Sequence, residues 1–97
     1  MLEQCYDKET KTLRIPFNIN EKLKDLPLNI EIIIFEENDD KNQHSMFDKS
    51  VDNLPSSLKY LTFGSTFNQK VDKLPNSLIY LTFGRYFNQT VNNLPKV

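Results

Sequence analysis

The sequence predicts an all-β fold, a short β-solenoid of about 3.5 coils built around one parallel sheet. The main observation is a twenty-residue unit that occurs twice, over residues 54–73 and 74–93, with identical residues at 13 of the 20 positions. Within each unit, apolar residues are spaced by three and then by two, which is typical of a short strand and not of a helix. A proline near the start of each unit and a glycine after each predicted strand indicate turns between the strands.

The unit continues, with lower fidelity, toward the N-terminus. In a degenerate copy the two phenylalanine positions, Phe35 and Phe47, stand 12 residues apart instead of 4, so this copy carries an eight-residue insertion. Before it lies a partial repeat, in which we place Leu13 at the first phenylalanine position and Phe17 at the second. The chain 1–97 is therefore expected to be a single repeat domain made of an N-terminal cap and partial repeat (1–25), a degenerate repeat (26–53) with its insertion (36–46), two full repeats (54–73 and 74–93) and the start of a further repeat (94–97).

Stacked coils would place like side chains in continuous inner columns, and burying each apolar side chain would contribute roughly 1.5–3 kcal/mol. The predicted columns are Ile30, Leu58 and Leu78; Ile33, Leu61 and Leu81; Leu13, Phe35, Phe63 and Phe83; Phe17, Phe47, Phe67 and Phe87; and Val51, Val71 and Val91. We expect Asn68 and Asn88 to form an internal hydrogen-bond ladder at one corner, with Asp48 in the same column of the degenerate copy. Gly64 and Gly84 are expected to be turn residues with positive φ.

The two ends of such a stack differ. Around the turn-like residues 7–10, segments 3–6 and 11–15 can form a β-hairpin that caps the first coil. No cap is visible beyond the strand expected near 78–83. This C-terminal open edge allows a homo-oligomer, and a self-assembling structural protein is one alternative function.

Composition excludes several classes of function. The net charge of −1 gives no electrostatic reason to expect binding to nucleic acid or to an anionic membrane. No stretch approaches the roughly 20 apolar residues of a membrane span, and the charged N-terminus does not resemble a signal peptide. The single cysteine, Cys5, cannot form an internal disulfide, which favours an intracellular and cytoplasmic protein.

The unit LPxSLxYLTFGxxFNQxV, present at 54–71 and 74–91, closely resembles the FNIP repeat. The resemblance implies a β-solenoid similar to leucine-rich repeats, and a role in protein–protein interaction. Members of this family occur mainly in social amoebae and in giant viruses that infect amoebae, sometimes behind an F-box. About 12 residues before the repeats cannot hold an F-box, so a direct link to the ubiquitin-ligase machinery has no support in the sequence. Because relatives carry an F-box, the substrate-recognition role of F-box/FNIP ubiquitin-ligase adaptors is kept as an alternative.

The leading hypothesis is a protein-binding module, because stacked repeats present extended surfaces. The candidate contact residues are the outward positions of the predicted strands, where tyrosine and isoleucine are suited to an interface. They are Lys59, Tyr60, Thr62, Ile79, Tyr80, Thr82, Ile32 and Ile34. The competing interpretation is that these side chains only support the sheet by cross-strand packing. The polar insertion 36–46 is a second candidate contact region.

No enzyme, cofactor or metal site is expected. Cys5 has no base near it in the sequence, because the single histidine, His44, lies in the insertion. His44 together with Asp39 and Asp40 matches no metal-site spacing and is interpreted as a solvated loop. Two isolated glycines twenty residues apart cannot form a phosphate-binding loop.

Overall fold

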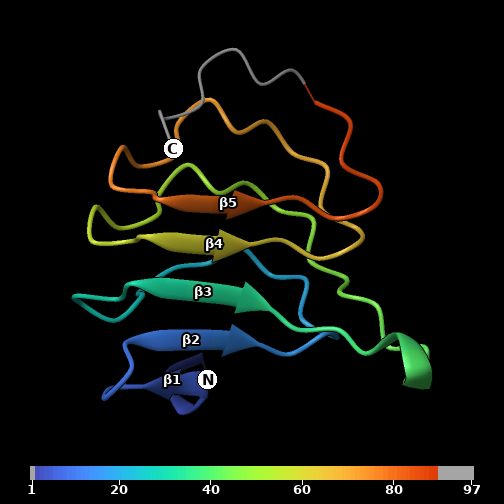
Figure 1. The fold of residues 1–97 in the computed structure, drawn as a ribbon, viewed down its shortest axis with the longest axis horizontal. Helices are drawn as coiled ribbons and strands as arrows, with labels where there is room; N and C mark the ends of the chain where they lie inside the picture. Colours follow the sequence, from blue (N-terminus) through green and yellow to red (C-terminus); the bar gives the residue numbers. More distant parts are fainter. Residues whose placement is uncertain (1, 90–97) are drawn as a thin grey trace.

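The computed structural model describes residues 2–89, which form one five-stranded sheet and two short 3-10 helices (Figure 1). The strands are β1 (Tyr6–Asp7), β2 (Thr12–Ile15), β3 (Ile32–Phe35), β4 (Tyr60–Thr62) and β5 (Tyr80–Thr82), and the helices are η1 (Leu2–Cys5) and η2 (Asp39–Lys41). β1 and β2 are antiparallel, and β2 to β5 are parallel in chain order. The predictions of an all-β chain, a parallel sheet and an N-terminal hairpin are confirmed, but the first arm of the hairpin is only Tyr6–Asp7, and residues 3–5, expected in that arm, lie in η1. No helix of the described residues is long and apolar enough to cross a membrane.

The repeats pair with an offset of twenty residues. Tyr60 lies opposite Tyr80 and Leu61 opposite Leu81 in the β4–β5 pair, so like residues of the two full units are neighbours. The insertion changes the offset between β3 and β4, where Ile33 pairs with Leu61. The predicted position of Val91 and the predicted start of a further repeat at 94–97 lie outside the described residues.

The predicted register of the partial repeat is wrong by two residues. Leu13 pairs with Ile33, and Ile15 pairs with Phe35, so Ile15 and not Leu13 stands at the first phenylalanine position. Strand β2 buries both residues completely because both point into the core. Leu13 belongs instead to the column that contains Leu61.

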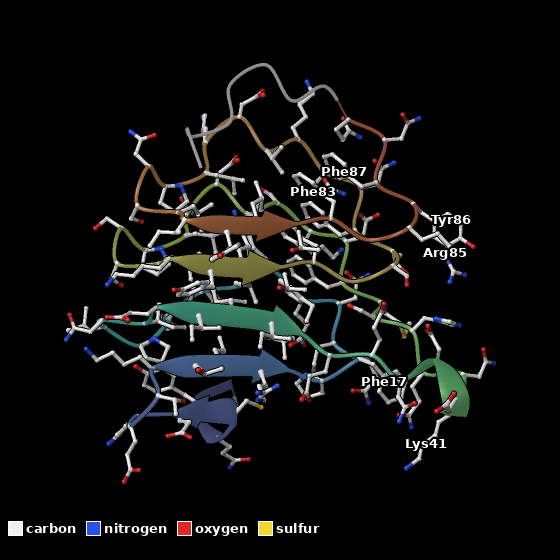
Figure 2. The ribbon with its side chains drawn as sticks, in the orientation of Figure 1. Phe17, Lys41, Phe83, Arg85, Tyr86 and Phe87 are labelled. Carbon is white, nitrogen blue, oxygen red and sulfur yellow. The ribbon has the colours of Figure 1, made fainter. Side chains whose placement is uncertain are left out.

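The second phenylalanine position of the partial repeat is Ile19, and the prediction of Phe17 there is wrong. The backbone N–H of Asp48 donates to Asn20 Oδ1 at 2.8 Å, just as the N–H of Asn68 donates to Asp48 Oδ1 at 2.9 Å. Asn20 is therefore the first rung of the corner ladder, and the preceding residue, Ile19, packs against the core. Phe17 lies beside the base of the insertion (Figure 2).

The core consists of six columns of apolar side chains between the sheet and the returning chain. With the corrected register, the described members of the columns are Leu13, Ile33, Leu61 and Leu81; Ile15, Phe35, Phe63 and Phe83; Ile19, Phe47, Phe67 and Phe87; Ile30, Leu58 and Leu78; Leu23, Val51 and Val71; and Leu26, Leu54 and Leu74. Within one unit the rings of Phe63 and Phe67 stack with centroids 3.8 Å apart, and the Phe67 ring stacks on that of Phe47 at 6.0 Å. Each phenylalanine is thus held by neighbours in its own unit and in the adjacent one.

The predicted corner ladder is confirmed for residues 20–89. Asn68 Oδ1 accepts from the backbone N–H of Asn88 at 2.9 Å and from Gln89 Nε2 at 3.1 Å. Asp48 Oδ1 accepts in the same way from the N–H of Asn68 and from Gln69 Nε2, both at 2.9 Å. The repeated Asn-Gln pair therefore satisfies backbone and side-chain groups between successive units.

The two glycines do not adopt positive φ, so that prediction is wrong. They are required by the close approach of neighbouring units. A Cβ on Gly84 would overlap the backbone carbonyl of Gly64, and a Cβ on Gly64 would overlap the side chain of Ser45. The missing Cβ at Gly64 and at Gly84 lets successive units pack at the distance that the sheet and the corner ladder require.

Candidate interaction surface

The outer face of the sheet carries a central column of apolar and aromatic side chains. Parallel pairing places Ile32 beside Tyr60, and Tyr60 beside Tyr80. The two tyrosine rings stack with centroids 5.3 Å apart and an interplanar angle of 16°. Tyr60 is 36% exposed and Tyr80 65% exposed, so much of this aromatic surface faces solvent.

A second column runs beside the first on the same face. It contains Arg14, Ile34, Thr62 and Thr82, which the strand register places next to one another. Ile34 is only half-buried, because it lies on the opposite side of the strand from the fully buried Ile33. The alternation of strand side chains therefore exposes isoleucine on the outer face while its neighbour fills the core.

Charged side chains border the column of Ile32, Tyr60 and Tyr80. Glu31 Oε2 lies 3.4 Å from Lys11 Nζ and 3.8 Å from Lys59 Nζ, so one carboxylate stands between two ammonium groups. Ile79, at the equivalent position of the next unit, is 50% exposed. The exposed ion pairs of Glu31 with Lys11 and with Lys59 contribute little to stability, about 0–1 kcal/mol each.

The strand pairing and burial place the candidate contact residues from the sequence together, on or beside this outer face. They are Lys59, Tyr60, Thr62, Ile79, Tyr80, Thr82, Ile32 and Ile34. The pairing of Lys11 with Glu31 was missed, because the register of the partial repeat was wrong. With Ile15 at the first phenylalanine position, Lys11 falls in the column of Lys59, and the alternation of charge becomes visible in the sequence.

The insertion 36–46 is a compact loop with its own hydrogen bonds. Asn38 and Gln43 form an antiparallel bridge with backbone bonds of 2.8 and 3.0 Å. The Asn38 side chain caps helix η2 by accepting from the N–H of Asp40, and Asn42 ends the helix in the left-handed conformation. Met46, just past the bridge, is 51% exposed.

Glu37 attaches this loop to the repeats. Its Oε1 accepts from the backbone N–H groups of Ser45 and Ser65, both at 2.9 Å, and its Oε2 accepts from Ser65 Oγ at 2.9 Å. Burial acts to raise the pKa of the Glu37 carboxyl, but the hydrogen bonds from Ser45 and Ser65 outweigh it and lower the pKa below its usual value. The carboxylate is thus a structural bridge between the insertion and the next unit.

The side chain of His44 lies within the insertion. Its Nε2 lies 3.1 Å from Asn42 Oδ1 and its Nδ1 lies 3.5 Å from Asp39 Oδ1. Among the side chains that the structure describes, from residue 4 to residue 89, no group of three or more His, Cys, Asp or Glu could hold a metal ion.

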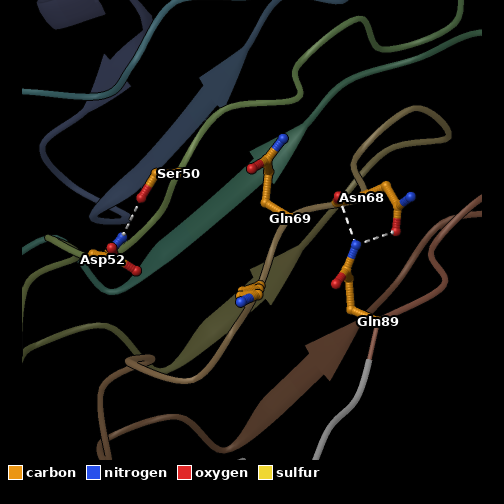
Figure 3. A pocket seen from close by; sticks show the side chains of 6 residues that line it. Ser50, Asp52, Asn68, Gln69 and Gln89 are labelled. Atoms are coloured by element: carbon orange, nitrogen blue, oxygen red, sulfur yellow. Dashed lines mark hydrogen bonds between the residues drawn. The ribbon is translucent and has the colours of Figure 1, made fainter.

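A shallow polar groove of about 380 Å³ lies along the corner ladder (Figure 3). It is lined by Ser50, Asp52, Asn68, Gln69, Lys70 and Gln89. The amides of Asn68 and Gln89 bond to each other within it. The same amide groups form the corner ladder that holds successive units together, so we interpret the groove as part of the ladder and not as a ligand site.

Fold and surface together define a repeat protein in which twenty-residue units form one sheet and share continuous core columns. The model of the FNIP Repeat family matches residues 47–73 and 67–96, which together span 50 of the 97 residues. The chain belongs to the FNIP repeat family. No curated protein and no solved structure gave a significant match.

Proposed function

We propose that the chain is a non-enzymatic protein-interaction module, a β-solenoid of about 3.5 coils similar to leucine-rich repeats, whose outer sheet face binds a partner protein. The observation that carries the proposal is the exposure of Tyr60, Tyr80 and Ile79 as neighbours on that face. Tyrosine is enriched in interfaces because a rigid ring buries a large area and its hydroxyl still forms a hydrogen bond.

Packing within the sheet does not account for this exposure. The rings of Tyr60 and Tyr80 stack through one face each. Such a cross-strand aromatic pair contributes roughly 0.2–1 kcal/mol to stability. Yet Tyr80 keeps 65% of its surface in solvent, and Ile79 keeps 50%. Exposed apolar side chains gathered on one face, with charges at the border, are typical of an interface with a polar rim.

The charged border indicates how a partner would be oriented. Lys11 and Lys59 flank Glu31 beside the column of Ile32, Tyr60 and Tyr80. Within the second column, Arg14 Nη1 lies 3.8 Å from Glu36 Oε2. Such rim charges contribute more to orientation and to the association rate than to affinity. A protein surface of mixed charge around an apolar centre is the complement of this face.

A non-enzymatic role agrees with the part played by the ionisable groups. Glu37, whose pKa is lowered, has both carboxylate oxygens occupied by Ser45 and Ser65. His44 is engaged with neighbours inside the insertion. A cytoplasmic location is proposed with the module, since Cys5 has no second cysteine for an internal disulfide.

The test uses a double variant in which both Tyr60 and Tyr80 are replaced by serine. Affinity capture from a host-cell lysate identifies proteins retained by the wild type, and binding of the identified protein is then measured with purified components. The control is Tyr86→Ser, which removes a tyrosine that is 63% exposed but lies after β5, outside the sheet face. We expect the double variant to lose the partner while Tyr86→Ser retains it, with circular dichroism unchanged in both. Equal binding by all three proteins would remove this face as the binding surface.

A further inference from the structure

A hollow of about 540 Å³ lies between the turn of the N-terminal hairpin and the corner of the chain that precedes β3. Its lining residues come from β1, from the hairpin turn and from that corner: Tyr6, Lys8, Lys11, Asp25, Pro27, Leu28 and Asn29. The two turns lie next to each other at the left of Figure 1, at the opposite end of the strands from η2. Sites for small ligands have volumes of roughly 300–1,000 Å³, so the hollow is large enough to hold one.

The hollow exists because the hairpin takes the place of a repeat. Between later units the corners are in contact, since Ser57 Oγ donates to the carbonyl of Ile30 at 2.6 Å. In the corner that precedes β3, Asn29 takes the position of Ser57, and Leu28 takes that of Ser56. The neighbouring segment is the hairpin turn, residues 8–11, and not a corner of the repeat. Open space therefore remains where later units touch.

Part of the lining is apolar. Tyr6, Pro27 and Leu28 contribute to it, and Leu28 is 87% exposed. The two full units carry polar residues at the position of Leu28, namely Ser56 and Asn76, so an exposed leucine is particular to this corner. An apolar side chain at the mouth of a hollow can cover the apolar group of a ligand.

The polar part of the lining carries both signs of charge. Lys8 and Lys11 supply ammonium groups, and Asp25 supplies a carboxylate. The Lys11 ammonium lies 3.4 Å from the Glu31 carboxylate, but Lys59 lies 3.8 Å from the same carboxylate. One anion thus serves two cations, and a further negative charge beside the two lysines of the hollow would be stabilised.

The backbone around the hollow is held in an unusual conformation. Lys11, Asp25 and Asn29 have φ of 57°, 53° and 67°, and they are three of the four non-glycine residues with positive φ in the described part of the chain. Such residues are strained and cluster at ligand sites. Asp7 Oδ1 accepts from the N–H of Glu9 at 2.9 Å, which fixes the hairpin turn and engages this carboxylate within it. The lining is therefore largely preformed.

We propose that the hollow binds the C-terminal residue of a partner chain, when that residue has a large apolar side chain. Its terminal carboxylate would lie beside the ammonium groups of Lys8 and Lys11. Its own backbone N–H would donate to the carboxylate of Asp25. Its side chain would pack on the apolar part of the lining. A terminal residue carries an anion, a donor and an apolar group on one Cα, which accounts for the mixed chemistry of the hollow.

The test is a titration of the full chain, followed by heteronuclear NMR, with N-acetyl-glycyl-phenylalanine as the probe. We expect saturable shifts of the backbone amides of Lys8, Lys11, Leu28 and Asn29. Two matched probes each lack one group: the C-terminal amide of the same dipeptide lacks the carboxylate, and N-acetyl-glycyl-glycine lacks the ring. Each should bind at least about tenfold more weakly.

Variants of the chain identify the groups that bind the probe. Leu28→Ser introduces the residue type found at this position in the next unit, and Lys8→Gln removes one ammonium group. Each should weaken binding of the probe at least about fivefold. The controls are Met46→Ser and Lys41→Gln, which remove an exposed apolar side chain and a cation from the insertion and should leave binding unchanged. Circular dichroism verifies the fold of every variant.

Three results would overturn the proposal. The absence of saturable shifts at the four amides would exclude the hollow as a binding site for a chain end. Equal binding of the acid and its amide would show that the lysines do not recognise a carboxylate. Equal binding of N-acetyl-glutamyl-phenylalanine amide, which carries its carboxylate on a side chain, would assign the hollow to an internal acidic segment. The outer sheet face does not line the hollow, so these outcomes are independent of the proposed function.

Discussion

Replacing Gly64 with alanine should destabilise the protein through one identifiable contact. An added Cβ would overlap the Ser45 side chain, with Ser45 Oγ at 2.6 Å and Glu37 Oε1 at 3.1 Å. Carbon atoms pack at about 3.5–4.0 Å, so the two units would have to separate locally. Overpacking of this kind costs about 1–3 kcal/mol, while Gly→Ala at a compatible φ would by itself stabilise by about 0.4–1 kcal/mol. The expected net loss is about 1–2 kcal/mol, measured by urea unfolding.

The control for this prediction is a double-mutant cycle. Ser45→Gly removes the side chain that the new methyl group would meet, so Gly64→Ala in that background should cost little. The coupling free energy between the two substitutions should be about 1–2 kcal/mol. Gly84→Ala has no such rescue, because its Cβ would meet the backbone of Gly64. Additive effects at Gly64 and Ser45 would refute the explanation that close approach requires the glycine.

Three further predictions concern the ladder, the insertion and the core. Asp48→Ala should cost about 1–3 kcal/mol, because it leaves the N–H of Asn68 without its acceptor, while Asp48→Asn keeps an acceptor oxygen and should be close to neutral in urea unfolding. The pKa of Glu37 is lowered in the folded state, so its contribution to stability is fully present above the usual value of 4.5 and is lost as the pH falls through the folded pKa. Unfolding measured from pH 3 to 7 should therefore show a larger loss of stability in the wild type than in Glu37→Gln. Phe67→Ala should lower the free energy of unfolding by about 3–5 kcal/mol, since the ring is 1% exposed and stacks on three others. Its control, Thr66→Ala at the exposed neighbouring position, should change the free energy of unfolding by less than about 0.5 kcal/mol.

Equal losses at Asp48 for alanine and asparagine would show that the carboxylate acts through its charge and not as an acceptor. A wild type and a Glu37→Gln variant with the same pH dependence would contradict the lowered pKa of the Glu37 carboxyl. A small effect of Phe67→Ala would contradict the continuous aromatic column.

The repeat period predicts most of the fold because the two full units differ at few positions. Apolar spacing in each unit identifies the strand and its inward face, and an offset of twenty residues then specifies the pairing of Leu61 with Leu81. The outer face follows from the same alternation, so the positions of Tyr60 and Tyr80 could be predicted without coordinates.

The partial repeat could not be placed by spacing alone. Leu13 and Phe17 stand four residues apart, and so do Ile15 and Ile19, so both pairs fit the two phenylalanine positions. The aromatic side chain of Phe17 favoured the wrong pair. A better signal is the spacing of seven residues from Ile19 to Leu26, which equals that from Phe67 to Leu74.

The role of the glycines depends on contacts between units and not on local conformation. A glycine after a strand is compatible both with a turn of positive φ and with a close approach by another segment. Only the positions of Ser45 and Gly64 relative to the next unit decide between them. The same holds for Glu37, whose partner Ser65 is 28 residues away and could not be inferred from the insertion itself.

The central claim is that units twenty residues apart lie side by side in register. Cross-strand nuclear Overhauser effects between β4 and β5 test it most directly, because short distances between backbone protons identify each parallel pair. We expect contacts that pair Tyr60 with Tyr80, Leu61 with Leu81 and Thr62 with Thr82. Contacts at another offset, or the sequential pattern of a helix over 58–63 and 78–83, would contradict it.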